Sequence, residues 1–358
     1  MFRLSSWERV RRAAELAEPD MVPVAPYIGN HAAVLAGIPI DRYCTSGEAM
    51  ARAQWEAWKI YGHDILAPIS DTYYIAEGFG VEVDHHPDST PTFRAPAVKE
   101  LDAVERLEIP DPHRAGRMSV YLEAIRRLRD RVEDEAPIRA PGTGLFTLAG
   151  HLMGTERFLM EVALADAEPG GAAEGALRML LDKTTQALAA FEKACLDAGA
   201  RVLGVGDSLA SSDVISPAMF DKWVLPFEKR LFAELNEHGK QYGALMLFHV
   251  CGNTTPILES MADCGAQLLE LDSKVALRLA KERIGQRVCL VGNVDPSAVL
   301  RNGSVADVER AATQAIRDAG PRGGFILGSG CEVPAHTPRA NIEAMIRVAR
   351  NHRYPMDQ

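Results

Sequence analysis

Short apolar runs that alternate with helical patterns are the feature of this sequence that most restricts its fold. Several of the runs are apolar throughout, which is typical of parallel strands that are buried on both faces. Strands that alternate with helices indicate a parallel sheet. Eight such strands predict a TIM (β/α)8 barrel, with a doubly wound open sheet as the alternative. The expected strands cover residues 21–28, 65–70, 137–142, 201–207, 244–250, 266–272, 288–294 and 324–330.

The segments between these runs define the rest of the organisation. The first 20 residues have an amphipathic pattern that predicts an N-terminal helical extension. Residues 216–239 are helical in pattern but contain Pro226, so we expect this helix to be kinked or broken there. Residues 75–98 interrupt the alternation and predict a hairpin or lid-like insertion. Because no linker or repeat divides the chain, residues 1–358 are expected to form a single barrel domain.

Composition and charge indicate which kinds of macromolecule or surface this protein is not expected to bind. The chain has 358 residues, 47% of them hydrophobic and 25% charged, with a formal net charge of −10 and no basic run. Nucleic acid and anionic membrane surfaces are therefore not expected partners. The N-terminus lacks the apolar core of a signal peptide, and no apolar run approaches the length of a membrane span. We expect a cytoplasmic protein with reduced thiols that is a monomer or a homodimer.

Polar and thiol side chains follow the ends of several expected strands. In a TIM barrel, the chemistry is located at the carboxyl ends of the strands, which meet at one rim. Acidic, amide, imidazole and thiol groups from distant parts of the chain are therefore expected to converge there. These residues are Asp71, Asp207, His249, Cys251, Asp272, Asn293, Asp295 and Cys331.

His249, Cys251 and Cys331 form a candidate metal site. Histidine nitrogen and cysteine thiolate are preferred ligands of Zn²⁺, and catalytic zinc sites often use three protein ligands. The same donor set disfavours Mg²⁺ and Ca²⁺, which require oxygen. A cysteine taken alone is usually a small buried hydrophobic residue, and spacing alone leaves that interpretation open for these residues too. We expect Cys44, Cys195, Cys264 and Cys289 to be such buried hydrophobic residues.

Three stretches carry a family resemblance: 249-HVCGNTTPILESMADCGAQLLELDSKV-275, 290-LVGNVDPSAVL-300 and 328-GSGCEVPAHTPRANIEAMI-346. They resemble the uroporphyrinogen decarboxylase superfamily, and within it the corrinoid-dependent methyltransferases such as the methylcobamide:coenzyme M methyltransferases. The resemblance implies a TIM barrel in which His249, Cys251 and Cys331 bind a catalytic zinc ion. It further implies an exchangeable acidic fourth ligand, for which Asp272 is the first candidate and Glu270 the second.

The resemblance also bears on whether this protein is a porphyrinogen decarboxylase. Asp71 lies where the decarboxylases carry their catalytic aspartate. Those enzymes also have an arginine-rich N-terminal motif that binds substrate carboxylates, whereas residues 24–37 of this chain contain no arginine. The decarboxylases also lack the His-x-Cys…Cys pattern. Both departures favour a methyltransferase over a decarboxylase.

The expected reaction is therefore methyl transfer from a methylated corrinoid to a thiol that zinc holds as a thiolate. Asp272, Asp71 and Asp207 are the candidate catalytic residues. Asn293, Asp295, Tyr73 and His31 are candidates for contact with the corrinoid or substrate, and Tyr74 is a further candidate at the barrel mouth.

The chain has no D-x-H-x-x-G corrinoid-binding motif, so we expect the corrinoid to be free or carried by a partner protein. The acceptor stays open among coenzyme M, another thiol and a folate. Alternative functions are alkyl transfer from a different donor, a decarboxylase-like lyase, and a non-catalytic corrinoid- or tetrapyrrole-binding protein.

Overall fold

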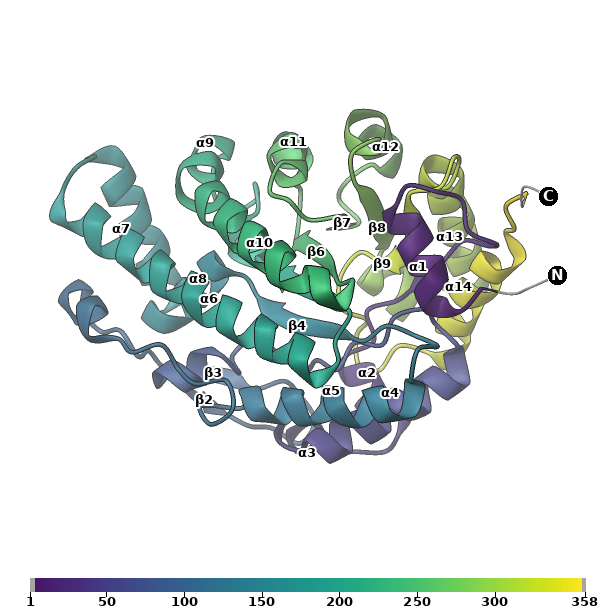
Figure 1. Ribbon diagram of the computed structural model, residues 1–358, viewed down its shortest axis with the longest axis horizontal. Helices are drawn as coiled ribbons and strands as arrows, with labels where there is room; N and C mark the ends of the chain where they lie inside the picture. The colour runs from purple at the N-terminus through teal and green to yellow at the C-terminus, as the bar shows by residue number, and fades with distance from the viewer. Residues whose placement is uncertain (1–3, 356–358) are drawn as a thin grey trace.

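A curled parallel sheet forms the centre of the protein in a computed structural model, which describes residues 4–355 (Figure 1). Its strand order is β1-β9-β8-β7-β6-β5-β4, and every neighbouring pair is parallel. The strands lie close to seven of the eight predicted apolar runs. They are β1 (Val24–Ala25), β4 (Arg139–Thr143), β5 (Val202–Gly206), β6 (Leu245–Val250), β7 (Leu268–Leu271), β8 (Cys289–Val294) and β9 (Phe325–Ser329).

A short segment at residues 64–66 joins the two edges of this sheet. The Asp64 amide donates to the Val24 carbonyl of β1 at 2.7 Å, and the Arg139 amide of β4 donates to the Leu66 carbonyl at 2.8 Å. The chain therefore closes as the predicted TIM barrel. The prediction of a regular strand over residues 65–70 is wrong, because only an isolated bridge at Leu66 forms. Pro68 has no amide hydrogen to donate, so it cannot extend this ladder.

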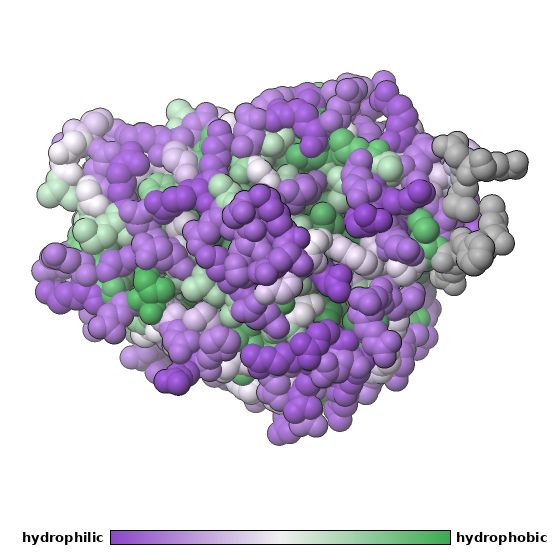
Figure 2. Space-filling model, viewed as in Figure 1, coloured by the Kyte–Doolittle hydropathy of each residue, from purple (hydrophilic) through white to green (hydrophobic). Residues whose placement is uncertain are grey.

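Helices surround the sheet and present their polar faces outward, so the face in Figure 2 is mostly hydrophilic. Their apolar stripes pack on the strands. The α-helices are α1 (Ser6–Ala14), α2 (Asn30–Leu35), α3 (Ile40–Thr45), α4 (Gly47–Tyr61), α5 (Met118–Val132), α6 (Leu145–Met153), α7 (Thr155–Ala167), α8 (Ala172–Ala198), α9 (Pro217–Met219), α10 (Leu225–Gly239), α11 (Leu258–Ala262), α12 (Leu277–Ile284), α13 (Val305–Ala319) and α14 (Arg339–Asn351). Across residues 4–355, none of the helices combines the length and the apolar character needed to cross a bilayer.

The predicted interruption near Pro226 is confirmed. After α9 the chain makes a π-helical turn, η4 (Phe220–Val224), and α10 begins directly behind it with Pro226 in its first turn. A proline is tolerated there because the first amides of a helix have no partner within the helix.

The predicted insertion contains a hairpin. After the 3₁₀ turn η1 (Ala76–Phe79), strands β2 (Glu82–Asp84) and β3 (Thr92–Ala95) pair antiparallel outside the barrel, and the 3₁₀ segment η2 (Leu101–Arg106) follows (Figure 1).

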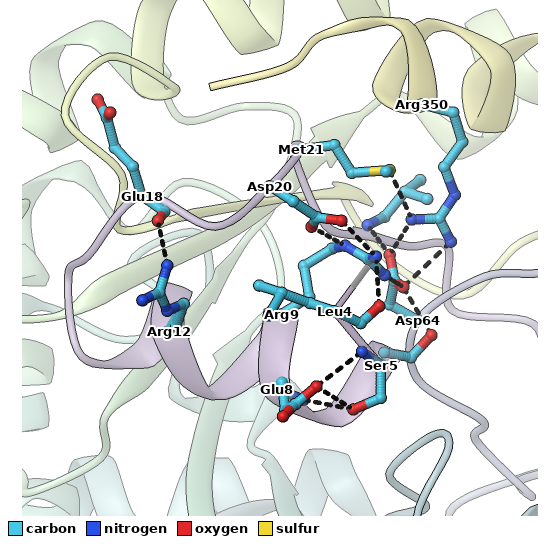
Figure 3. A network of polar contacts seen from close by, with 12 residues as sticks. Leu4, Ser5, Glu8, Arg9, Arg12, Glu18, Asp20, Met21, Asp64 and Arg350 are labelled. Carbon is cyan, nitrogen blue, oxygen red and sulfur yellow. Dashed lines mark hydrogen bonds and ion pairs between the residues drawn. The ribbon is translucent and has the colours of Figure 1, made fainter. Parts of the chain in front are cut away.

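The N-terminal helix α1 is fixed by a buried ionic network at the amino-terminal end of the barrel (Figure 3). The Arg9 guanidinium is 1% exposed and donates to the Asp20 and Asp64 carboxylates at 2.8 and 2.7 Å. Arg350 of α14 donates to the other Asp64 oxygen at 2.9 Å. That oxygen also accepts the Val24 amide of β1 at 2.8 Å. Asp64 therefore joins α1, the closing segment, β1 and α14 at the end of the barrel opposite the candidate site.

Candidate metal centre

His249, Cys251 and Cys331 meet at the carboxyl end of the sheet. His249 lies in β6, Cys251 follows that strand directly, and Cys331 lies two residues beyond β9. His249 Nε2 lies 3.1 Å from Cys251 Sγ, and the two sulfur atoms are 3.7 Å apart. A tetrahedral zinc ion with Zn–S bonds of ~2.3 Å places two sulfur ligands about 3.8 Å apart. The donor set and the sulfur spacing therefore both fit zinc.

Local hydrogen bonds orient the histidine. His249 Nδ1 lies 2.9 Å from the Glu270 carbonyl oxygen, and it must donate because a carbonyl can only accept. This bond fixes a proton on Nδ1, so Nε2 is the nitrogen that can bind a metal once its own proton is lost, an arrangement typical of metal-ligating histidines.

A glycine turn orients Cys251. Gly252 has a φ of +80°, in the left-handed region, and its amide donates to Asp272 Oδ2 at 2.8 Å. A Cβ atom at this position would lie 2.5 Å from the Asp213 carboxylate, so only glycine fits the turn without displacement. The turn brings Cys251 to the same side of the chain as His249.

The three side chains influence each other's protonation. A hydrogen bond from the Cys331 thiol and the adjacent His249 imidazolium lower the pKa of Cys251 to about 4. Burial alone would lower the pKa of His249, but the Cys251 thiolate raises it to about 9. The hydrogen bond to that thiolate, together with burial, raises the pKa of Cys331. Cys251 is therefore already a thiolate at neutral pH, which is the form that binds metals.

Both predicted fourth-ligand candidates are engaged by the protein. Asp272 accepts the amides of Gly252 and Lys274 at 2.8 and 2.9 Å. Glu270 is 1% exposed and accepts two hydrogen bonds from the Arg139 guanidinium, at 2.9 and 3.0 Å. Burial alone would raise the pKa of Glu270, but the charge of Arg139 lowers it. Within residues 4–355, neither carboxylate belongs to the set of ligand atoms formed by the histidine and the two cysteines.

Asp71 lies in a second ionic cluster at the mouth. Its two oxygens accept from the Arg117 guanidinium at 2.7 and 2.8 Å, and the same guanidinium donates to Glu77 at 2.6 Å. The pKa of Arg117 is raised despite burial, because these carboxylates stabilise its charge. Sequence reasoning missed Arg117, which precedes α5 and belongs to no strand.

Three predicted rim residues have structural partners. Asp207 is fully buried and accepts the amides of Phe146 and Thr147, in the first turn of α6, at 3.0 and 2.8 Å. Burial raises its pKa. Asn293 donates to two backbone carbonyls of the 272–275 turn, at 2.9 and 2.7 Å. Asp295 accepts the amides of residues 297 and 298, at 2.8 and 2.7 Å. These contacts hold α6 and the loops after β7 and β8 in place.

The predicted mouth residues differ in accessibility. Tyr73 is half-buried, and its ring centre lies 4.3 Å from that of His151. His31 is buried, with Nδ1 donating to the Ala335 carbonyl at 3.0 Å, and burial lowers its pKa. The expectation that Tyr74 lines the mouth is wrong. This side chain is fully buried, and its hydroxyl accepts the Thr143 amide because Tyr74 packs inside the barrel wall.

Asn30 and Glu332 connect the metal centre with the Asp71 cluster, and sequence reasoning missed both. The Asn30 amide and side chain donate to Glu332 Oε1 at 3.0 and 3.2 Å, and the side chain also donates to the Ser70 carbonyl at 2.6 Å. Glu332 directly follows Cys331, while Ser70 directly precedes Asp71. The glutamate was visible in the Cys-Glu-x-Pro stretch, but no local pattern revealed its partner 302 residues earlier.

A parallel TIM barrel with two cysteines and a histidine at its carboxyl rim therefore defines the class of protein. The chain belongs to the uroporphyrinogen decarboxylase (URO-D) family, which matches residues 5–352. The methylcobamide:CoM methyltransferase MtbA of Methanosarcina mazei is 30% identical over 257 residues, covering 72% of this chain and 69% of the relative.

Two further comparisons agree with this family. A methyltransferase structure from Methanosarcina mazei superimposes with a TM-score of 0.86 at 26% identity, covering 97% of this chain and 99% of that one. A uroporphyrinogen decarboxylase of Syntrophotalea carbinolica is 26% identical over 323 residues, covering 89% of each chain.

Proposed function

We propose that this protein is a zinc-dependent methyltransferase that moves a methyl group from a methylated corrinoid to a thiol. The cluster of His249, Cys251 and Cys331 carries the proposal, because its donor set and sulfur spacing fit zinc. The similarity to methyltransferases that act on methylcobamides supports the choice of donor. The corrinoid is either free or bound to a partner protein, and the protein acts in the cytoplasm.

The reaction is a nucleophilic displacement at the methyl carbon. The acceptor loses its proton to solvent, and the thiolate electron pair forms the new sulfur–carbon bond. The carbon–cobalt bond breaks with both electrons remaining on cobalt, so methyl-Co(III) becomes Co(I). Bound zinc would supply one element of this chemistry, by stabilising the acceptor as a thiolate at neutral pH.

The protein's own residues position the reactants. Arg139 fixes Glu270, whose backbone carbonyl orients His249. Asp272 accepts the amide of Gly252 and so maintains the turn that presents Cys251. We assign Asp272 this positioning role. Such contacts keep the ligand atoms in place before substrate binds, which lowers the cost of reaching the reactive geometry.

The remaining predicted residues receive narrower assignments. Asp71 fixes the position of Arg117 at the mouth of the barrel. Asp207 accepts an amide of the first turn of α6 and so stabilises that helix. Tyr73 presents a half-buried ring beside His151, which suits contact with a flat corrinoid macrocycle. Asn293, Asp295 and His31 hold rim segments through the hydrogen bonds described above. We propose that they shape the docking surface.

The test combines metal analysis with a methyl-transfer assay. Protein purified under reducing conditions should contain about one zinc ion per chain, and it should consume methylcobalamin only when a thiol is added. The Cys331→Ala variant should lose both zinc and activity. Cys264→Ala is the matched control, because that buried thiol lies outside the cluster and should retain both.

The alternatives predict different results. A parent protein without zinc would refute the proposal, and full zinc content in Cys331→Ala would refute the assignment of that ligand. Activity on a porphyrinogen without metal would favour a decarboxylase. Corrinoid binding without turnover of any methyl donor would favour a binding protein.

A further inference from the structure

Two guanidinium groups around the metal centre, those of Arg139 and Arg117, are already paired with carboxylates. Arg139 donates both terminal nitrogens to Glu270, and the pair is almost completely buried, with side-chain exposures of 6% and 1%. Arg117 contacts two carboxylates, Asp71 and Glu77, at 2.6 to 2.8 Å. The charge of each guanidinium is therefore already neutralised by a carboxylate, and the Arg139 donor that has no partner, Nε, is itself buried.

Four further basic groups near this rim add no uncompensated positive charge: Lys274, His151, His31 and His85, which lies 3.7 Å from Glu77 and whose pKa is lowered by burial. Lys274, beside Asp272, forms an ion pair with Asp213 at 2.7 Å. Burial lowers the pKa of His151 to about 4, so this imidazole beside Tyr73 is neutral at pH 7. His31 is buried, and burial lowers its pKa as well.

The Arg117 cluster belongs to the same mouth as the metal centre. Asn30 donates to the Ser70 carbonyl and to Glu332 Oε1, which joins the residue before Asp71 to the residue after Cys331. Two carboxylates against one guanidinium leave the Arg117 cluster with net negative charge. Such a cluster at the entrance favours positive over negative ligands.

Charges around the centre are therefore predominantly negative. Three cations, Arg117, Arg139 and Lys274, face five carboxylates, which are Asp71, Glu77, Asp213, Glu270 and Asp272. Two protein thiolates and an acceptor thiolate would together exceed the charge of one divalent zinc ion. A second negative group on the acceptor would enter this environment without a partner, which is unfavourable in a partly buried site.

We propose, resting on the proposed function, that the acceptor thiol has an uncharged or positively charged tail and not a sulfonate or carboxylate tail. Selectivity arises because the cations around the metal centre are held in ion pairs with a larger number of carboxylates, which leaves excess negative charge there. This sets the substrate class apart from 2-mercaptoethanesulfonate, the coenzyme M (CoM) named for the methylcobamide:CoM methyltransferase relative.

Three two-carbon thiols that differ only in the tail test the proposal. They are 2-mercaptoethylamine, 2-mercaptoethanol and 2-mercaptoethanesulfonate. Their binding to the Co²⁺-substituted protein is followed by the sulfur-to-cobalt absorption band, independently of methyl transfer. Each Kd is expressed for the thiolate form, because the three thiols differ in pKa. We expect the amine to bind at least about tenfold more tightly than the sulfonate, and the difference should shrink as salt is added.

A charge variant links the selectivity to the Arg117 cluster. Glu77→Gln keeps an oxygen that accepts the Arg117 hydrogen bond but removes one negative charge. It should tighten binding of the sulfonate relative to the amine by about fivefold. Glu237→Gln is the matched control, because it changes the net charge equally at the opposite end of the barrel, where Glu237 pairs with Lys240. Its selectivity should match the parent.

The outcomes separate this inference from the proposed function. Equal Kd values, or tightest binding of the sulfonate, would overturn the inference and leave methyl transfer intact. The expected order of binding without turnover of methylcobalamin would support the inference and overturn the proposed function. No binding of any thiol to the Co²⁺ protein would overturn both. Equal responses of Glu77→Gln and Glu237→Gln would also overturn the assigned origin of the selectivity.

Discussion

Replacing Arg139 with methionine tests the buried ion pair beneath the metal centre. Arg139 and Glu270 are 6% and 1% exposed, and two hydrogen bonds of 2.9 and 3.0 Å join them. Arg139 also lies over the Tyr27 ring, 4.1 Å from its centre. Methionine retains much of the length and the apolar contact of arginine. The substitution therefore removes mainly the charge, and it leaves the Glu270 carboxylate buried without its partner.

The expected cost follows from this burial. Removing one partner of a buried ion pair destabilises a protein by about 3–5 kcal/mol, because an uncompensated charge remains in the interior. His249 Nδ1, 3.6 Å from Glu270 Oε2, is the nearest remaining positive group when it is protonated. Replacing both Arg139 and Glu270 by methionine removes the stranded charge. The double variant should therefore lie within about 1.5 kcal/mol of the parent.

Urea denaturation of the metal-free proteins, followed by tryptophan fluorescence, measures these free energies of unfolding. Zinc affinity, measured by competition with a chromophoric chelator, reports separately on His249. We expect Arg139→Met to weaken zinc binding by about tenfold, because the Glu270 carbonyl loses its fixed position. A loss of stability below about 1 kcal/mol, or a double variant no more stable than Arg139→Met, would refute the reasoning.

Three further substitutions test other parts of the structure. Gly252→Ala places a Cβ 2.5 Å from a carboxylate oxygen, so it should displace Cys251 and weaken zinc binding about tenfold in the same competition assay; unchanged affinity would contradict this. Asp207→Asn removes an acceptor from the first turn of α6 and should lower the free energy of unfolding by about 2–3 kcal/mol in urea. Asp20→Asn should cost about 1–3 kcal/mol at pH 7. Burial alone would raise the Asp20 pKa, but Arg9 lowers it, so this contribution is present above the unfolded pKa of about 3.9 and is lost at lower pH. The difference between Asp20→Asn and the parent should therefore shrink towards pH 3, and a constant difference would contradict the sign.

The fold and the meeting of one histidine with two cysteines could be predicted because their signals are local. An apolar run bounded by turn residues indicates a buried strand wherever it occurs, and parallel strands bring their carboxyl ends to one edge. His249, Cys251 and Cys331 meet for this reason, although 80 residues separate the two cysteines. The error at residues 65–70 arose because Pro68 prevents hydrogen bonding that the apolar pattern alone would allow.

The partners of the carboxylates could not be predicted, because they come from distant segments without a pattern of their own. Arg117 reaches Asp71 from 46 residues away, and Arg139 reaches Glu270 from 131 residues away. Asp207 lies at a strand end, where a catalytic aspartate would be expected. Its carboxylate instead accepts amides of α6, about 60 residues earlier in the chain. Position at the rim is therefore necessary for a catalytic role but does not establish one.

This difference has a physical cause that also bears on the choice of acceptor. The metal-binding chemistry of histidine and cysteine belongs to their own atoms, whereas the role of a carboxylate depends on whether a cation holds it. Around this centre, Arg117 and Arg139 are paired with carboxylates, so charges that the sequence presents as available are already neutralised. A ligand experiences the net charge that remains after the cations and carboxylates have paired, and around this centre that net charge is negative. An acceptor with an anionic tail would therefore add a further negative charge beside carboxylates that already outnumber the cations, whereas one with a neutral or cationic tail would not.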